Sequence, residues 1–514
     1  MFKTESKLLK KIFIILNVFL VQVAIAQESS IVFNKSIENN DNSFYETLVY
    51  AKEDSSNKLF VVQKLFSNSS TPKGYYIKRF SDKMVLEERI KIDIENNEIR
   101  GMFINKTKLF LIQFEYSREE KAYNINLLSS EKTSFDFKKS TLFTVDRRDI
   151  DKYDKFGERE NSTFPNYEDF NPGGVLTSSE NGKFYCYSLR LKRKKTTQNL
   201  FLVFDENFKL LSSNIFEDKS KGNVLVTNLI ITDDGVIYFL SRKYDKDIPI
   251  SKIITSRDNY TIKLNKLNSE KFEEINFNNN EFNGGSAYIT AENEKIFIYG
   301  YFSENQHKLF NSAGFSGVFN CVINSKTQKI SHFSKYFFKD MLNNKRDKPV
   351  DEVGRDLAFK NVFIDNGEII YNSEVHYTDG NNNSCMHFGN IISSKFNYDG
   401  KLTWLNTINK NQTACFGWGK TVNFSFISLY NSDKIYYLTN YDYLKNDDIN
   451  NDNSLCNLIT VNTSTTIKTQ SKLTKGTIAA IYFKNFINLS NLSVLTEGMD
   501  FSGQPILVKV SVRN

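Results

Sequence analysis

The chain repeats one short β-meander eight times, and the eighth copy lacks its last strand. Each unit reads as an apolar strand, a tight turn, a second apolar strand, a longer connection and a hairpin. The eight copies of the second strand are Lys58–Val62, Lys108–Ile112, Lys183–Tyr187, Val236–Leu240, Lys295–Tyr299, Glu368–Tyr371, Lys434–Leu438 and Leu492–Leu495. A regular array of units built from short strands indicates radial β architecture, most often a β-propeller.

We therefore expect an all-β fold, a β-propeller of four-stranded antiparallel blades. Eight blades is the expected number, with seven as the alternative because the unit over Glu98–Lys138 is the least regular. The apolar strand Ile31–Ile37 belongs to no unit, and we expect it to supply the missing strand of the last blade. This closure would remove two unpaired sheet edges. A disordered mature N-terminus is the other interpretation.

The first 26 residues have the organisation of a secretory signal peptide. Four lysines at positions 3, 7, 10 and 11 precede the apolar run Ile12–Val21, and Ala24-Ile25-Ala26 precedes an expected cleavage before Gln27. A membrane anchor is the alternative, although the apolar run is short for a span of about 20 residues. We expect residues 1–26 to be a signal peptide and residues 27–514 to form a single propeller domain. The mature protein would be exported, to the periplasm or the cell exterior, with no transmembrane segment.

Two stretches in the second half of the chain carry a family resemblance. The hairpin Ser394–Trp404 and the later segment Ser432–Asp442 resemble the repeats of exported Bacteroidetes β-propeller-type proteins of unknown function. The Ala-Ile-Ala-Gln cleavage region and the frequent Asn, Lys and Ile fit the same origin. The resemblance is good over residues 350–445 and diffuse elsewhere. It implies a propeller fold and export, and it brings no catalytic assignment.

Several kinds of site are missing from the sequence. There is no Gly-rich phosphate loop, no His-Glu-x-x-His and no Gly-x-Ser-x-Gly motif. The formal net charge is +7, and the one dense basic run, Arg190–Lys195, reads as a solvated loop. We therefore expect no nucleic-acid partner.

Histidine and cysteine gather in the sixth unit. His376, Cys385 and His387 fall in what reads as a long loop, and Cys415 follows the last strand of that unit. Such a cluster could bind zinc or copper. In an oxidising compartment, however, two loop cysteines more often form a disulfide, so we predict a Cys385–Cys415 bridge. Free thiols and a metal site remain the alternatives.

One further segment suggests a cation site. Asp448, Asn450, Asp452 and Ser454 place oxygen ligands at every second position, as a calcium loop does. The glycine and the downstream bidentate Glu of such a loop are missing at the expected spacing. We expect no cofactor, with calcium left open.

The long connections all join strands at the same rim, because turns within the unit's two hairpins are short throughout. Connecting loops on a rigid frame carry function, so we expect contacts on this long-loop face. The aromatic and polar candidates are Phe164, Tyr167, Glu168, Asp169, Phe170 and Trp418. We expect a non-catalytic binding or scaffolding propeller of the bacterial cell envelope, with an envelope protein or a glycan as partner. The alternative is a propeller glycoside hydrolase or polysaccharide lyase that uses loop carboxylates.

Overall fold

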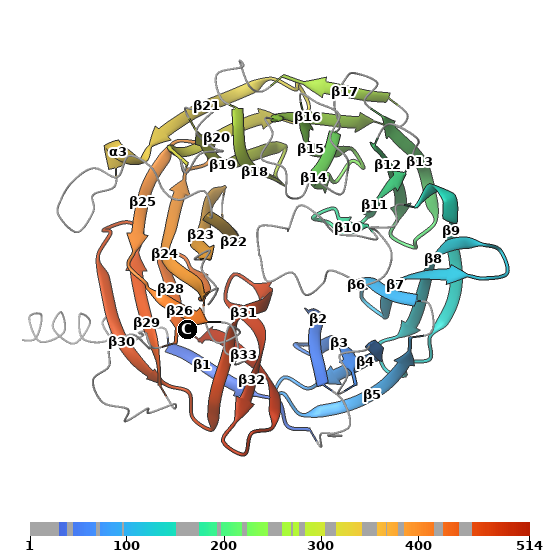
Figure 1. Ribbon diagram of the computed structural model, residues 1–514, viewed down its shortest axis with the longest axis horizontal. Coiled ribbons are helices and arrows are strands. Elements are labelled where there is room, and N and C mark those ends of the chain that lie inside the picture. The colour runs from blue at the N-terminus through green and yellow to red at the C-terminus, as the bar shows by residue number, and fades with distance from the viewer. Residues whose placement is uncertain are drawn as a thin grey trace, which may run out of the picture.

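In the computed structural model, the described residues form eight antiparallel sheets arranged as the blades of a ring (Figure 1). The structure describes residues 30–38, 45–67, 72–94, 97–150, 174–192, 197–217, 224–244, 260–268, 271–276, 283–303, 315–341, 357–365, 367–378, 385–415, 425–440 and 455–513. The chain is therefore an all-β propeller of eight blades, as the repeat count predicts. The unit over Glu98–Lys138, the least regular in the sequence, is a regular four-stranded sheet, so the alternative of seven blades is excluded.

Blades 1 to 4 follow one another along the chain, each with its first strand innermost. Blade 1 is β2 (Tyr45–Glu53), β3 (Leu59–Phe66), β4 (Pro72–Phe80) and β5 (Leu86–Asp93); blade 2 is β6 (Asn97–Ile104), β7 (Lys108–Ser117), β8 (Ala122–Glu131) and β9 (Lys138–Asp146). Blade 3 is β10 (Val175–Ser178), β11 (Phe184–Lys192), β12 (Thr197–Asp205) and β13 (Leu210–Glu217); blade 4 is β14 (Val224–Ile231), β15 (Ile237–Tyr244), β16 (Tyr260–Asn268) and β17 (Lys271–Ile275).

Blades 5 to 8 complete the ring. Blade 5 is β18 (Asn283–Glu292), β19 (Lys295–Ser303), β20 (Gly317–Asn324) and β21 (Ile330–Phe337); blade 6 is β22 (Leu357–Asp365), β23 (Glu368–Thr378), β24 (Cys385–Phe396), β25 (Leu402–Ile408) and a short β26 (Gln412–Cys415). Blade 7 is β27 (Ile427–Asn431), β28 (Lys434–Thr439), β29 (Leu455–Asn462) and β30 (Lys468–Thr474); blade 8 is β31 (Ile478–Ser490), β32 (Ser493–Asp500), β33 (Pro505–Arg513) and β1 (Ser30–Lys35). The described helices are a 3₁₀ turn, η1 (Arg147–Asp149), and α3 (Phe338–Met341).

The second strands of the blades are largely buried because the neighbouring blades cover both of their faces. Seven of the eight residues of β3, Leu59 to Leu65, are buried, as are eight of the nine residues of β19. A strand buried on both faces reads as a continuous apolar run rather than as an alternating one. This burial explains why the second strand is the clearest repeat in the sequence.

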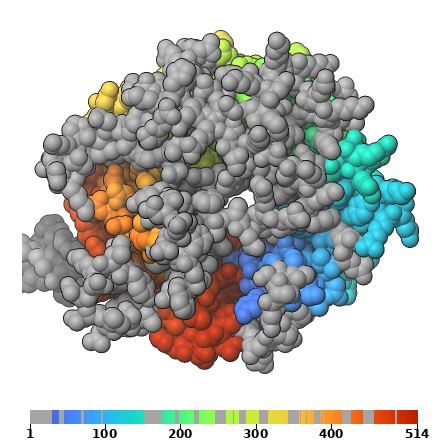
Figure 2. Space-filling view, viewed as in Figure 1, coloured from blue at the N-terminus to red at the C-terminus, as the bar shows by residue number. Residues whose placement is uncertain are grey.

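The strand at the N-terminus closes the ring, as predicted. β1 pairs antiparallel with β33, from Ser30 opposite Arg513 to Lys35 opposite Val508. Beyond the strand, the backbone N–H of Ser36 donates to the Leu507 carbonyl at 2.8 Å, and the N–H of Leu507 donates to Ser36 Oγ at 3.0 Å. Blades 8 and 1 consequently lie side by side where the chain ends meet, in red and blue (Figure 2). The last blade gains its fourth strand in this way.

Short turns with an αL residue connect the third and fourth strands and pack on the preceding blade. In blade 3, the Asp205 carboxylate accepts the N–H groups of Asn207 and Lys209, and Phe208 adopts φ 61°. Phe208 is 2% exposed, and its ring stacks on Tyr185 with centroids 4.5 Å apart and approaches Phe110 of blade 2. The turn therefore acts as a plug between blades 2 and 3.

The sixth blade differs from the expectation in two respects. The segment from His376 to Gly389 is not one long loop, because β23 extends to Thr378 and β24 begins at Cys385. Residues after Ile408 are also more regular than a linker: β26 pairs with the first half of β24, while β25 pairs with its second half. An unusually long β24 offers an edge that β25 does not cover, and β26 occupies it.

A buried ion pair fixes the chain between β25 and β26. Lys410 pairs with Glu374 of β23, and its ammonium also donates to the Phe388 carbonyl at 3.2 Å and to Gln412 Oε1 at 3.0 Å. Ser425 donates to the other oxygen of Glu374 at 2.6 Å. A buried ion pair is stable only when further hydrogen bonds compensate both charges, and here they do.

Candidate binding site in the central channel

The first strands of the blades line the central channel (Figure 1), and several of them are bulged. Their register shifts fall between Leu48 and Tyr50 in β2, Ile99 and Gly101 in β6, Val226 and Asn228 in β14, and Phe359 and Asn361 in β22. A bulge sets two residues against one on the partner strand and turns the side chains that follow it. In β2 and β6 the residues just after the bulge are those that face the pocket described next.

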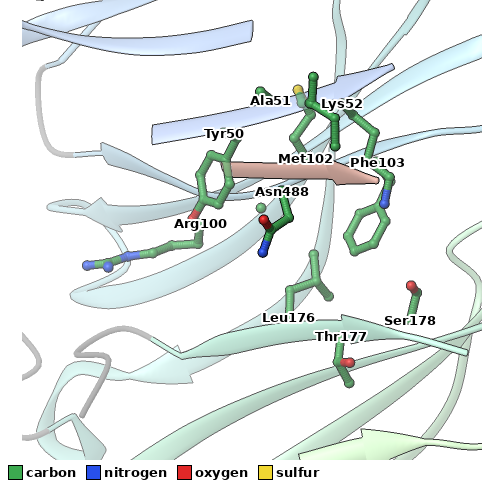
Figure 3. Close-up of a pocket in the computed structure, with 12 residues that line it drawn as sticks. Tyr50, Ala51, Lys52, Arg100, Met102, Phe103, Leu176, Thr177, Ser178 and Asn488 are labelled. Carbon is green, nitrogen blue, oxygen red and sulfur yellow. The ribbon is translucent and has the colours of Figure 1, made fainter. Parts of the chain in front are cut away.

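A pocket of about 340 Å³ lies in the channel where blades 8, 1, 2 and 3 meet (Figure 3). Its twelve lining residues are Tyr50, Ala51 and Lys52 of β2, Arg100, Gly101, Met102 and Phe103 of β6, Leu176, Thr177 and Ser178 of β10, and Asn488 and Leu489 of β31. On β2, β6 and β31 these residues lie toward the strand end that enters the short first turn. The pocket therefore occupies the half of the channel nearer the short turns.

A lysine and two aromatic rings define the character of the pocket. The Lys52 ammonium lies 6.0 Å from the centroid of the Phe103 ring, and the Tyr50 ring faces the same space (Figure 3). Lys52 is accessible from the channel, yet the surrounding protein displaces much of its bulk water, and this desolvation lowers the pKa of Lys52. An anion beside the ammonium would offset that cost.

Four polar side chains of the pocket have no internal hydrogen-bond partner. They are Lys52, Thr177, Ser178 and Asn488, and the statement holds for the part of the chain that the structure describes. Figure 3 shows the Asn488 amide between the ring of Tyr50 and the side chain of Leu176, and the Ser178 hydroxyl on the side of Phe103. These groups are available to a ligand, because polar groups inside a pocket bind water or ligand when the protein offers nothing else.

Arg100 contributes to the wall of the pocket rather than to its charge. Its guanidinium points away from Phe103 and Ser178 in Figure 3 and donates to Glu98. The second oxygen of Glu98 accepts from Lys64 at 3.2 Å. The three side chains are buried, and the two cations share the Glu98 carboxylate within the wall. Lys52 is left as the cation that faces the open space.

A separate cluster of carboxylates lies at the closure between blades 8 and 1. The buried Lys78 ammonium binds Glu38 and Glu46, each at 2.6 Å. Glu497 of β32 accepts the Leu48 N–H at 2.5 Å, at the β2 bulge. Burial raises the pKa of Glu497 to about 7, and the neighbouring Glu46 adds to the rise. Burial raises the pKa of Glu46 as well, against the opposing effect of Lys78.

Most of the side chains proposed from the sequence lie outside the described residues. This holds for the long-loop candidates Phe164, Tyr167, Glu168, Asp169, Phe170 and Trp418, for the calcium candidates Asp448, Asn450, Asp452 and Ser454, and for residues 1–29. Among the described residues, no three His, Cys, Asp or Glu side chains form a group that could hold a metal ion. The described part likewise contains no helix long and apolar enough to cross a membrane.

The cysteines fall into two groups. Cys186, Cys321 and Cys456 are buried free thiols, and burial raises the pKa of each. Cys385 is disulfide-bonded, and the residue opposite it in the β24–β26 register is Cys415. The register is the one that a bridge between these two residues requires. The nearby His387 Nδ1 contacts Thr413 Oγ1 at 2.9 Å across the same strand pair.

The pocket residues are absent from the sequence candidates. They lie on strands rather than on long loops, and their meeting depends on how four blades are arranged. One signal was present: Gly101 interrupts an apolar strand, and a Cβ there would come within 2.5 Å of Leu176 Cδ2. A glycine inside a strand often marks close approach of another segment.

No known family model matches the chain, and no curated protein matches it. The β-propeller domain of the Trilobed protease from Pyrococcus furiosus is 11% identical, with a TM-score of 0.38, covering 84% of this chain and 96% of that one. The WD40 domain of SCAP from fission yeast is 9% identical, with a TM-score of 0.39, covering 92% and 98%. The polysaccharide lyase Uly1 is 9% identical, with a TM-score of 0.36, covering 80% and 90%. The propeller assignment rests on the strand pairing of this chain itself.

Proposed function

We propose that the protein is a non-catalytic binding or scaffolding propeller of the bacterial cell envelope, and that its ligand enters the channel pocket. One observation carries the proposal. The twelve described residues that line the pocket supply rings, an ammonium and an amide, but no carboxylate. Hydrolysis or elimination at a glycosidic bond uses a positioned acid and base, commonly carboxylates. Rings with a few polar groups are typical of a binding pocket.

The envelope location rests on the sequence of the N-terminal segment. Its lysines, its apolar run and its small-residue cleavage pattern are those of an exported protein. The Bacteroidetes-type repeats between residues 350 and 445 fit the same setting. We also propose the long-loop face as a second contact surface. It lies on the rim opposite the half of the channel that holds the pocket.

A matched pair of tyrosine variants tests the channel site. Tyr50→Ala removes a ring from the pocket, whereas Tyr45→Ala removes a ring that is 67% exposed on the same strand. Binding of envelope glycans and soluble envelope proteins to the purified mature protein is measured by calorimetry for both variants. Loss of binding with Tyr50→Ala alone supports the channel site. Equal binding by both variants would place the ligand elsewhere.

One observation favours the alternative, a glycoside hydrolase or polysaccharide lyase. A carboxyl with a pKa of about 7, such as that of Glu497, keeps a large protonated fraction at neutral pH, as a general acid needs. It lies on a strand rather than on a loop, and its oxygen is held by the Leu48 N–H. Release of reducing ends from envelope polysaccharides, abolished in Glu497→Gln, would establish this function instead.

A further inference from the structure

Resting on the proposed binding function, we infer that the channel pocket binds an acidic sugar residue, a uronate of a polysaccharide. Its carboxylate would pair with Lys52, its ring face would pack against Phe103 or Tyr50, and its hydroxyls would bind Ser178 and Asn488.

The charge of the pocket selects an anion. Lys52 has no carboxylate partner among the described residues, and its ammonium lies over the ring of Phe103. The other cation, Arg100, is compensated by Glu98. A single uncompensated ammonium in a partly desolvated space binds one carboxylate more strongly than it would in open water, because the local dielectric is lower.

The rings and the neutral groups distinguish a sugar from a simple anion. An aromatic ring packs well against the C–H face of a pyranose, and Tyr50 and Phe103 lie on two sides of the same pocket (Figure 3). The Asn488 amide has two donors and an acceptor, and the Ser178 hydroxyl can donate and accept. Groups of this kind match the hydroxyls of a sugar, whereas a bare phosphate would leave the rings unused.

The pocket size limits the ligand to about one residue at a time. A volume of about 340 Å³ is at the small end for ligand sites. The pocket lies within the channel of the ring, so an end or a side branch of a chain fits it better than the middle of a stiff polymer. We therefore expect oligosaccharides with a terminal uronate to bind.

The test compares three probes by calorimetry on the full mature protein. They are a trisaccharide ending in glucuronate or galacturonate, its neutral hexose counterpart, and hexaglutamate. The uronate trisaccharide should bind, and Lys52→Gln should weaken it about 10- to 100-fold, since a lost charge-assisted hydrogen bond has that effect. Lys83→Gln, at an exposed lysine in a blade 1 turn, is the matched control and should bind as the parent does.

A second variant keeps the test independent of Lys52. Asn488→Asp places a carboxylate beside the ligand, so it should abolish uronate binding while Asn488→Ala only weakens it. Uronate binding that is unchanged in Lys52→Gln and Asn488→Asp would overturn the inference. Failure of the uronate trisaccharide to bind would also overturn the inference. If the neutral sugar or hexaglutamate then bound in the pocket, the proposed binding function would still hold. Cleavage of the uronate probe would instead refute the non-catalytic function and retain the ligand class.

Discussion

Replacing Glu497 with glutamine should remove a pH dependence from the stability of the ring. The carboxyl lies between blades 8 and 1, and its Oε1 accepts a hydrogen bond from the Leu48 N–H at 2.5 Å. Glutamine has the same shape and retains that carbonyl acceptor, but it cannot ionise. The variant therefore isolates the cost of placing a charge at this site.

The sign follows from the direction of the pKa shift. Burial raises the pKa of Glu497 from 4.5 to about 7. Below pH 4.5 the carboxyl is protonated in both the folded and the unfolded chain. Between pH 4.5 and 7 the folded chain holds a proton that the unfolded chain has lost, so stability falls as the pH rises. Above pH 7 both states are ionised, and the contribution no longer changes.

The size of the effect follows from the same two values. A difference of about 2.5 pKa units corresponds to about 3 kcal/mol, at 1.36 kcal/mol for each unit. The free energy of unfolding of Glu497→Gln, relative to the parent, should therefore rise by about 2 to 3 kcal/mol from pH 5 to pH 8. Other groups titrate in the parent and in the variant alike, so they largely cancel in the difference.

Urea unfolding followed by circular dichroism, at constant ionic strength and at several pH values, measures this difference. Glu119→Gln, which removes a carboxyl from an exposed turn of blade 2, is the control for the general effect of deleting a surface charge. A difference between Glu497→Gln and the parent that stays constant from pH 5 to pH 8 would refute the assignment of Glu497 as a buried, protonated acid.

Three further predictions concern the frame. Phe208→Ala should destabilise the protein by about 3 to 5 kcal/mol, because it empties the space between blades 2 and 3. Phe208→Gly should cost about 1 kcal/mol less than Phe208→Ala, because φ is 61° at this position. A larger loss of unfolding free energy for glycine than for alanine, measured in urea, would contradict the αL conformation of this turn. Removing residues 30–37 should lower the melting temperature by several degrees, whereas a version that begins at Ser30 should match the parent; equal melting curves would exclude closure by β1. Alkylation of the denatured, unreduced protein should label three cysteines and spare Cys385 and Cys415, whose bridge should contribute about 3 kcal/mol; label at both would disprove it.

The frame could be predicted from the sequence because its signals are local. An apolar strand after a tight turn recurs eight times, and the apolar strand near the N-terminus belongs to none of these eight units. A last blade with three strands would leave sheet edges unpaired, so the pairing of β1 with β33 could be predicted. Short strands such as β10 (Val175–Ser178) give a weak sequence signal, because four residues carry little periodicity.

The pocket could not be predicted because its residues meet only in the closed ring. Tyr50 and Asn488 lie near opposite ends of the chain, and nothing near either of them in the sequence points to the other. The bulges that turn Tyr50 and Phe103 toward the channel have no consistent residue signature, since Val49 and Arg100 occupy comparable places in β2 and β6. In blade 6, Gln412–Cys415 has the composition of a linker, and it is a strand because β24 gives it an edge.

The pairing of β1 with β33 also determines when folding can finish. β33 follows β1 by about 470 residues along the chain, so at about 5 to 20 residues per second the first strand waits on the order of a minute for its partner. Contacts between such distant segments form slowly. During that interval blade 1 can assemble from neighbouring segments, but the Leu507 side of the closure does not yet exist. A chaperone that shields exposed strand edges should therefore speed the recovery of the complete chain far more than that of a fragment of three consecutive blades.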